Sequence, residues 1–171
     1  MQISADQAVF LLHAVLPTLE NEHRLTTKVL KAIPAGQADY QPDPNAKSAF
    51  DLAWHIAIAE TRFLAAVASG HFSFDPIPKP AELSEVITFY TSNFSKNVSA
   101  IKQLSGEQLA TVMDFRGMFQ LPAVAFLTFN INHIVHHRGQ LSVYLRPMGG
   151  KVPAIYGESY DSEQEKLAAA G

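Results

Sequence analysis

The sequence predicts an all-α protein built as a four-helix bundle, and three observations support this fold class. Four segments of 20 to 30 residues repeat apolar residues every three or four positions, which is the spacing of one buried helix face. Joints rich in proline or glycine separate these segments. No stretch alternates apolar and polar residues convincingly over five or more positions, so no sheet is expected. Four such helices bury their apolar faces by packing against one another.

The first helix is expected over residues 5–33. Ser4 and Gln7 have the spacing of a capping box, in which each side chain bonds the other residue's backbone N–H. Residues 34–36, Pro-Ala-Gly, end the segment. Its buried stripe comprises Ala5, Val9, Leu12, Leu16, Leu19, Leu30 and Ile33.

The second helix is expected over residues 48–69, after a joint rich in proline and aspartate. Ser48 is a favourable N-cap, and Gly70 suits the left-handed conformation that commonly ends a helix. Prolines 76, 78 and 80 exclude a helix in the next joint. The third helix is then expected over residues 82–104, with the stripe Leu83, Ile87, Tyr90, Phe94, Ile101 and Leu104.

The fourth helix is expected over residues 122–146, with Pro122 in its first turn. Residues 107–120 before it give a weaker pattern, interpreted as one turn followed by an extended piece. From residue 147 onward we expect loop and a polar tail that either forms a short helix or frays. The whole chain, residues 1–171, is expected to form a single domain.

Composition excludes several classes of protein. Apolar residues make up 47% of the 171 and charged residues only 17%, against about 25% on average, so the chain is not intrinsically disordered. The net charge is −3 and the basic residues are scattered, which disfavours nucleic-acid binding. Neither a signal peptide nor a membrane span is expected, so we predict a cytoplasmic protein. The chain has no cysteine and therefore no disulfide, thiolate ligand or cysteine nucleophile.

The fourth helix carries a polar patch on its inward stripe, which reads Phe126, Asn130, His133, His137, Gln140 and Tyr144. His133 and His137 are four residues apart, so both imidazoles lie on one face, one turn apart, and can reach a common ion. A solvated helix face would also explain such a pair. The position of the pair on a core-facing stripe favours metal binding, because buried polar groups need partners.

The second helix supplies a third imidazole at His55, on its own inward stripe. A single histidine on an apolar face is usually a core residue hydrogen-bonded to a carbonyl. Together with His133 and His137, however, His55 would complete a site of three imidazoles. We therefore predict His55, His133 and His137 as ligands of a divalent metal whose remaining positions are open to water or substrate.

The remaining histidines have weaker interpretations. His136 is expected to face outward or to support a ligand, whereas His23 is a fourth ligand, an acid or base, or a hydrogen-bonded core residue, with the last favoured. His71 is expected in a loop, and His13 has no assigned role. Catalytic residues remain unassigned, because Glu60 lies about 140° round the helix from His55. His23, Tyr144 and Tyr156 are the other candidates for proton transfer.

The sequence resembles the DinB-like (damage-inducible B) family in two blocks. Residues 132–149, which contain His-His-Arg-Gly-Gln, followed by residues 152–157, look like the last helix and tail of that family. Residues 48–57, Ser-Ala-Phe-Asp-Leu-Ala-Trp-His-Ile-Ala, look like its second-helix histidine motif.

This resemblance implies an up-down-down-up four-helix bundle, usually a homodimer, with nickel or zinc at His55, His133 and His137. It also implies an anchoring role for Arg138 and close helix packing at Gly139. Pro17 and an interior poor in acidic residues match no particular subfamily. Relatives include S-transferases and isomerases that use small thiols such as bacillithiol or mycothiol.

The resulting functional hypothesis is a metal-dependent enzyme acting on a small-molecule substrate, with a low-molecular-weight thiol as co-substrate in a transferase. The absence of cysteine agrees with an imported thiol. A metal-dependent hydrolase, a non-catalytic binding module and a plain structural bundle are the alternatives. The phenylalanines of the connecting segments, Phe72, Phe74, Phe115 and Phe119, either contribute to a dimer interface or cap the ends of the bundle.

Overall fold

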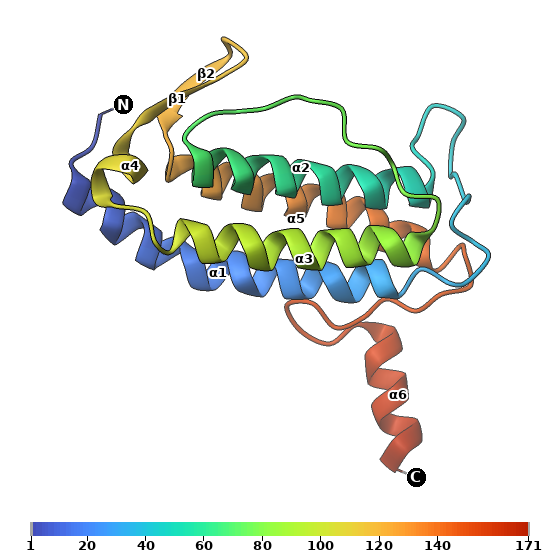
Figure 1. Cartoon of the computed structure of the whole chain (residues 1–171). Coiled ribbons are helices and arrows are strands. Elements are labelled where there is room, and N and C mark those ends of the chain that lie inside the picture. The colour runs from blue at the N-terminus through green and yellow to red at the C-terminus, as the bar shows by residue number, and fades with distance from the viewer. Residues whose placement is uncertain (1, 171) are drawn as a thin grey trace.

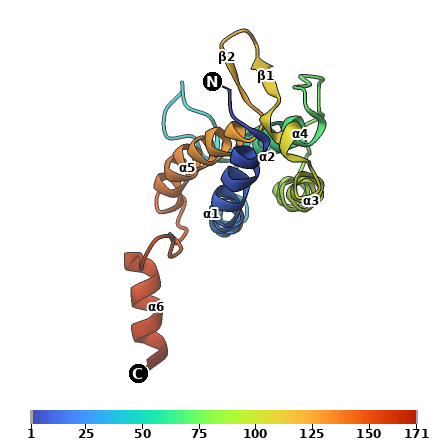
Figure 2. The same ribbon diagram turned by 90° about the vertical axis from the view of Figure 1, so that its left-hand side faces the viewer.

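Four long helices lie side by side in the computed structural model, which describes residues 2–170 (Figures 1 and 2). They are α1 (Ala5–Lys31), α2 (Ala49–Ser69), α3 (Leu83–Ile101) and α5 (Ala125–Leu145). In Figure 1, α1 and α5 run in one direction while α2 and α3 run in the other, so the predicted up-down-down-up bundle is confirmed. Two shorter helices, α4 (Gly106–Ala110) and α6 (Tyr160–Ala170), complete the helical elements of the described residues.

The helices begin and end largely where local chemistry requires. Ser4 and Gln7 form the predicted capping box of α1, and the Ser48 hydroxyl accepts the Asp51 N–H at the start of α2. Gly70 has φ 81°, the left-handed conformation that glycine adopts without the steric cost of a Cβ. All four long helices are shorter than predicted. Helix α1 ends at Lys31 rather than residue 33, α2 begins at Ala49 rather than residue 48, α3 spans 83–101 rather than 82–104, and α5 spans 125–145 rather than 122–146.

The expectation of no sheet was wrong, because residues 112–122 form a β-hairpin. Strands β1 (Val112–Phe115) and β2 (Phe119–Pro122) pair antiparallel, with Val112 opposite Pro122 and Phe115 opposite Phe119. The turn has two consecutive residues at positive φ, Arg116 at 57° and Gly117 at 70°. Each strand has only four residues, too short to show an alternating pattern.

The same hairpin shifts the beginning of the last bundle helix. Pro122 ends β2 instead of opening a helix, and α5 starts three residues later, at Ala125. The intervening N–H groups of Ala123 and Val124 donate to the carbonyls of Thr111 and Leu109, which ties the hairpin to α4. The predicted turn before the extended piece is therefore the short helix α4.

The interior of the bundle is apolar at both ends and polar in between. Helix α2 packs against α3 and α5, and α1 packs against α5 and α3. One apolar cluster surrounds Leu19, Leu64 and Phe126, and a second surrounds Leu30, Leu52 and Leu145. The polar tail is helical rather than frayed, because residues Tyr160–Ala170 form α6. This helix points away from the bundle in both views (Figures 1 and 2).

Within residues 2–170, no helix combines the length and the apolar character needed to cross a membrane.

Candidate metal centre

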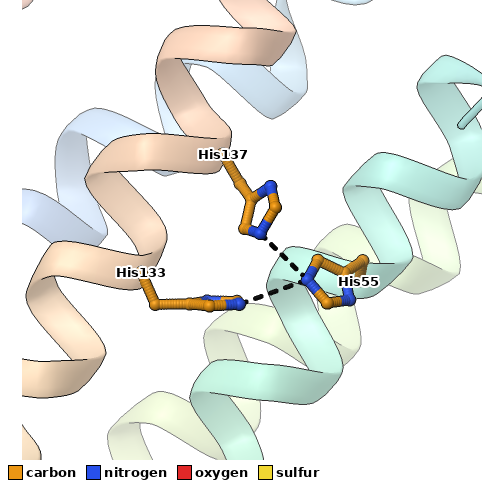
Figure 3. Close-up of side chains that lie close together, drawn as sticks. All are labelled: His55, His133 and His137. Atoms are coloured by element: carbon orange, nitrogen blue, oxygen red, sulfur yellow. Dashed lines mark hydrogen bonds between the residues drawn. The ribbon is translucent and has the colours of Figure 1, made fainter. Parts of the chain in front are cut away.

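The three predicted ligands meet between two neighbouring helices, with His55 on α2 and His133 and His137 one turn apart on α5 (Figure 3). The imidazoles point toward one another across the gap between the helices. His55 Nε2 lies 3.2 Å from His133 Nε2 and 3.0 Å from His137 Nε2. Nitrogen ligands about 2.1 Å from one ion, at angles of about 90–110°, lie about 3.0–3.4 Å apart. The spacing of these nitrogens therefore suits a single metal ion.

Hydrogen bonding within the cluster favours a cation at its centre. His137 Nδ1 lies 3.1 Å from the Gln140 Oε1, which accepts only, so Nδ1 carries the proton and Nε2 presents its lone pair. A protonated His55 Nε2 can direct its single N–H at only one of the two neighbouring nitrogens, and an unprotonated one sets its lone pair against the lone pair of His137 Nε2. A metal ion accepts all three lone pairs and removes this conflict.

The three imidazoles are neutral at physiological pH, as metal ligands must be. Burial, followed by the nearby His137, lowers the pKa of His55 to about 4. Burial also lowers the pKa of His133 to about 4, with further contributions from His137, His55 and His136. The pKa of His137 is lowered by burial as well, although its bond to Gln140 opposes the shift. No proton needs to leave at neutral pH before a metal binds.

Sequence comparison assigns the chain to a family. The sequence profile described as the DinB family matches residues 6–167, nearly the whole chain. The chain belongs to the DinB family. Among curated relatives, YjoA of Bacillus subtilis (strain 168) is 29% identical over 133 residues, covering 74% of this chain and 84% of YjoA. YrdA of the same organism is 36% identical over 83 residues, which is 48% of each chain.

Solved structures of DinB-like proteins share the fold. The crystal structure of YjoA from Bacillus subtilis superposes with a TM-score of 0.71 at 23% identity, covering 85% of this chain and 99% of YjoA. A DinB-like protein from Bacillus cereus ATCC 10987 gives a TM-score of 0.73 at 27% identity, covering 85% and 97%. The predicted resemblance to the DinB family is thus confirmed in both sequence and fold.

The lowered pKa values in this DinB-family bundle predict that the metal-free protein loses stability as the pH falls from about 6.5 to about 4. The unfolded histidines protonate near 6.5, whereas folded His55 and His133 resist protonation down to about 4. Between these values the unfolded state binds more protons, so acid favours unfolding. The urea midpoint of EDTA-treated protein at pH 7.5 and 5.5 measures this effect.

Two single-residue variants isolate the contribution of the cluster to this pH dependence. In His133→Gln, stability is expected to fall less between pH 7.5 and pH 5.5, because the variant lacks one imidazole that resists protonation in the folded state. His136→Gln replaces the exposed neighbour, which makes the smallest contribution to the lowered pKa of His133, and is expected to retain most of the wild-type decline. Equal slopes for wild type and His133→Gln would contradict a contribution from the cluster.

His23 and Glu60 form a separate buried group, not part of the metal cluster. His23 Nδ1 lies 2.6 Å from Glu60 Oε1, and the Tyr90 hydroxyl donates to Glu60 Oε2 at 2.8 Å. Burial and the Glu60 carboxylate raise the pKa of Tyr90 well above its ordinary value, so the hydroxyl remains a donor. His23 also stacks on Tyr90 and Phe94. The favoured interpretation of His23, a hydrogen-bonded core histidine, is confirmed.

Among the described residues, the other candidates for proton transfer make no direct hydrogen bond to the three imidazoles, and Tyr144 is linked to His137 only through Gln140. Tyr156 bonds Arg138 and Glu22, whereas Tyr144 is buried and accepts a hydrogen bond from Gln140. His136 is exposed, as expected for an outward residue.

Arg138 is an internal anchor, as the family resemblance implied. Its Nη1 lies 2.6 Å from Glu22 Oε2, and its Nη2 donates to the Tyr156 hydroxyl at 2.5 Å. Both members of the ion pair are almost completely buried. The expectation of an acid-poor interior was therefore wrong, since Glu22 and Glu60 both lie in the core. The burial of Glu22 could not be predicted from the sequence, because its partner Arg138 lies more than a hundred residues away along the chain.

Gly139 does not have the packing role that the resemblance implied. It is exposed, and a Cβ added there would meet no atom within 4 Å, apart from its own helix and chain neighbours. Close packing of α5 therefore does not depend on this glycine.

A pocket of about 330 Å³ lies directly beside the cluster, with His55 and His133 in its wall. The sequence did not predict it, because its lining comes from α2, the 70–82 connection, the hairpin and α5. The remaining lining residues are apolar or basic: Ile58, Ala59, Arg62, Phe63, Phe72, Phe74, Phe115, Arg116 and Phe129. A ligand in this pocket would touch two of the three imidazoles.

Proposed function

We propose that this DinB-family protein is a divalent-metal-dependent enzyme that binds zinc or nickel through His55, His133 and His137. The observation that carries the proposal is the convergence of three Nε2 atoms at separations suited to one ion. Three protein ligands leave a position for a substrate, the arrangement of catalytic rather than structural sites. A divalent ion in such a site lowers the pKa of a bound thiol or water and so supplies a nucleophile near neutral pH.

The reaction we favour is transfer of a small-molecule thiol to an electrophile. A carbon–sulfur bond forms, the leaving group departs with its electron pair, and the thiol proton passes to solvent. The chain has no cysteine of its own, so the sulfur must come from a co-substrate. Such thiols are kept reduced in the cytoplasm, the location we propose for this protein.

A metal-dependent hydrolase is the second candidate, and the surroundings of the cluster favour it less. Activation of water usually relies on a nearby general base. Within the described residues, the group that could hold a metal consists of histidines and includes no carboxylate. Both carboxylate oxygens of Glu60 are hydrogen-bonded, one to His23 and one to Tyr90. Gln140 is the polar partner of His137, and its amide is not a base. A thiol transferase depends less on a general base, because a thiol is more acidic than water and loses its proton more readily.

Turnover with a thiol tests the proposed function. Protein loaded with zinc or nickel is mixed with bacillithiol or glutathione and the electrophile 1-chloro-2,4-dinitrobenzene, and the aryl thioether is followed by absorbance. Metal-dependent product formation above the uncatalysed rate is the expected result, with His136→Ala as a control that retains activity. A loaded protein that hydrolyses 4-nitrophenyl acetate without thiol would identify the hydrolase instead. Metal binding without either reaction would identify a binding module.

We also propose that the protein is a homodimer. Phe10 is 71% exposed and Leu11 39% exposed on α1, which leaves apolar surface for a second copy to cover. The connecting-segment phenylalanines Phe72, Phe74 and Phe115 support this less, because they line the pocket instead. Light scattering coupled to gel filtration tests the proposal, and a monomeric mass would exclude it.

A further inference from the structure

The pocket beside the histidines has an aromatic wall assembled from separate parts of the chain. The Phe63 and Phe115 rings stack with centroids 5.5 Å apart and planes 27° apart. Phe72 meets Phe115 edge-on at 5.0 Å, and Phe129 lies 5.2 Å from Phe63. Rings held in this way present flat apolar surfaces, which favour a flat, unsaturated ligand body.

Two arginines add positive charge to the same pocket. The Arg116 guanidinium lies 4.0 Å from the centroid of the Phe74 ring, where the aromatic face stabilises it. It projects from the hairpin turn, where the Asp114 carboxylate accepts the Gly117 N–H at 2.8 Å. The Arg116 backbone has φ 57°, so this turn holds a non-glycine residue in the left-handed region.

Arg62 lies on α2 in the wall of this pocket and also borders a smaller pocket that contains Asp75. Its Nη2 donates to the Asp75 carbonyl at 3.0 Å, which fixes the position of the guanidinium. Its Nε is buried and has no hydrogen-bond partner within the described residues. A buried donor without a partner is costly, and this Nε is covered by the protein itself, so the Nη atoms are the part of Arg62 offered to a ligand.

No carboxylate of residues 2–170 forms a salt bridge with Arg62 or Arg116, and none of the described lining residues is acidic. This contrasts with Arg138 and Arg146, which are both paired with carboxylates. The pocket therefore combines an apolar aromatic body with two unneutralised guanidinium groups. Guanidinium groups bind carboxylates through charge-assisted hydrogen bonds.

We propose that this pocket binds an aromatic carboxylate, with its rings against the phenylalanine wall and its carboxylate on Arg62 and Arg116. A volume of about 330 Å³ lies at the small end of ligand sites and suits a body of one or two rings. His55 and His133 lie in the same wall, so a reactive carbon on the bound molecule would face the imidazole cluster. Assigning this molecule as the electrophilic substrate rests on the proposed function, whereas its binding does not.

Three probes with one common body test the proposal by calorimetry on the metal-free protein. They are 2-naphthylacetate, 2-(2-naphthyl)ethanol and 2-(2-naphthyl)ethylamine, which carry an anion, a neutral group and a cation. We expect the carboxylate to bind about 10-fold more tightly than the alcohol, and the amine to bind weakest. Equal affinities for the acid and the alcohol would overturn the proposal.

Arginine variants locate the anion. Arg116→Gln and Arg62→Gln are each expected to weaken carboxylate binding about 10-fold while leaving the alcohol affinity unchanged. Arg24→Gln, on the exposed face of α1, is the matched control and should change neither. Retention of the full carboxylate preference by Arg116→Gln would refute the assignment. Arg116 is exposed at the hairpin tip, so this variant still tests the proposal if Arg62→Gln fails to fold.

The metal-free measurement separates this proposal from the proposed function. Carboxylate binding by a protein that shows no metal-dependent turnover would support the pocket assignment and refute the enzyme. Thiol transfer to neutral electrophiles, with no preference for the naphthyl carboxylate, would support the enzyme and refute the pocket assignment.

Discussion

Replacing His133 with alanine is expected to lower bound zinc or nickel from about one ion per chain to less than about 0.1. The remaining imidazoles, His55 and His137, come from different helices and would hold the ion by only two bonds. His55→Ala is expected to have the same effect, because it removes the only ligand from α2. Elemental analysis of untagged protein, dialysed against each metal and then against metal-free buffer, measures the content.

Two further variants show whether the loss is specific to coordination. His136→Ala removes an exposed imidazole next to His137 and should leave the metal content unchanged. Gln140→Leu removes the acceptor that fixes the His137 tautomer, and should weaken metal binding about 10- to 100-fold without abolishing it. Full metal content in both His55→Ala and His133→Ala would show that the three histidines do not form the site.

Replacing Arg138 with alanine is expected to destabilise the protein by about 3–5 kcal/mol, because it leaves the Glu22 carboxylate buried without its partner. Arg138 also donates to the Tyr156 hydroxyl, so its loss removes one of the hydrogen bonds that hold the C-terminal segment against α5. Urea unfolding in the presence of EDTA measures the change in the free energy of unfolding without a contribution from bound metal.

An exposed ion pair provides the control for this measurement. Lys102 and Glu20 also pair at 2.8 Å, but both side chains are nearly half exposed, so Lys102→Ala should cost less than about 1 kcal/mol. Glu22→Gln, which keeps the shape and removes the charge, should also be strongly destabilising. A cost for Arg138→Ala no larger than that for Lys102→Ala would show that the buried pair does not stabilise the bundle.

The Glu22–Arg138 ion pair lies on the same turn of α5 as one of the candidate metal ligands, so loss of the pair and binding of a metal are expected to affect the same helix. Arg138 directly follows His137 on α5, and its partner Glu22 lies on α1. The ion pair thus fixes α5 against α1, while the imidazoles of the same turn face α2. A metal ion would join α5 to α2, so we expect the Arg138→Ala variant to regain part of its lost stability when zinc is added.

The sequence alone determined the helices and the predicted ligand set. Helix faces follow from a repeat of 3.6 residues, and caps such as Ser4 and Gly70 act within one turn, so both are local properties. His133 and His137 share a face by the same local rule. His55 could be added because it is the single histidine on the inward stripe of α2.

Only the tertiary structure decided what lies opposite each buried position. The periodicity of a helix shows that a face is buried but not which residue meets it, so the pairs Glu22–Arg138 and His23–Glu60 could not be predicted. The hairpin depends on pairing between two strands that are individually too short to give a pattern. The pocket depends on four segments, two before α3 and two after it in the sequence, and its charge follows from their packing. Such long-range contacts arise when the helices assemble, and local sequence rules carry no information about them.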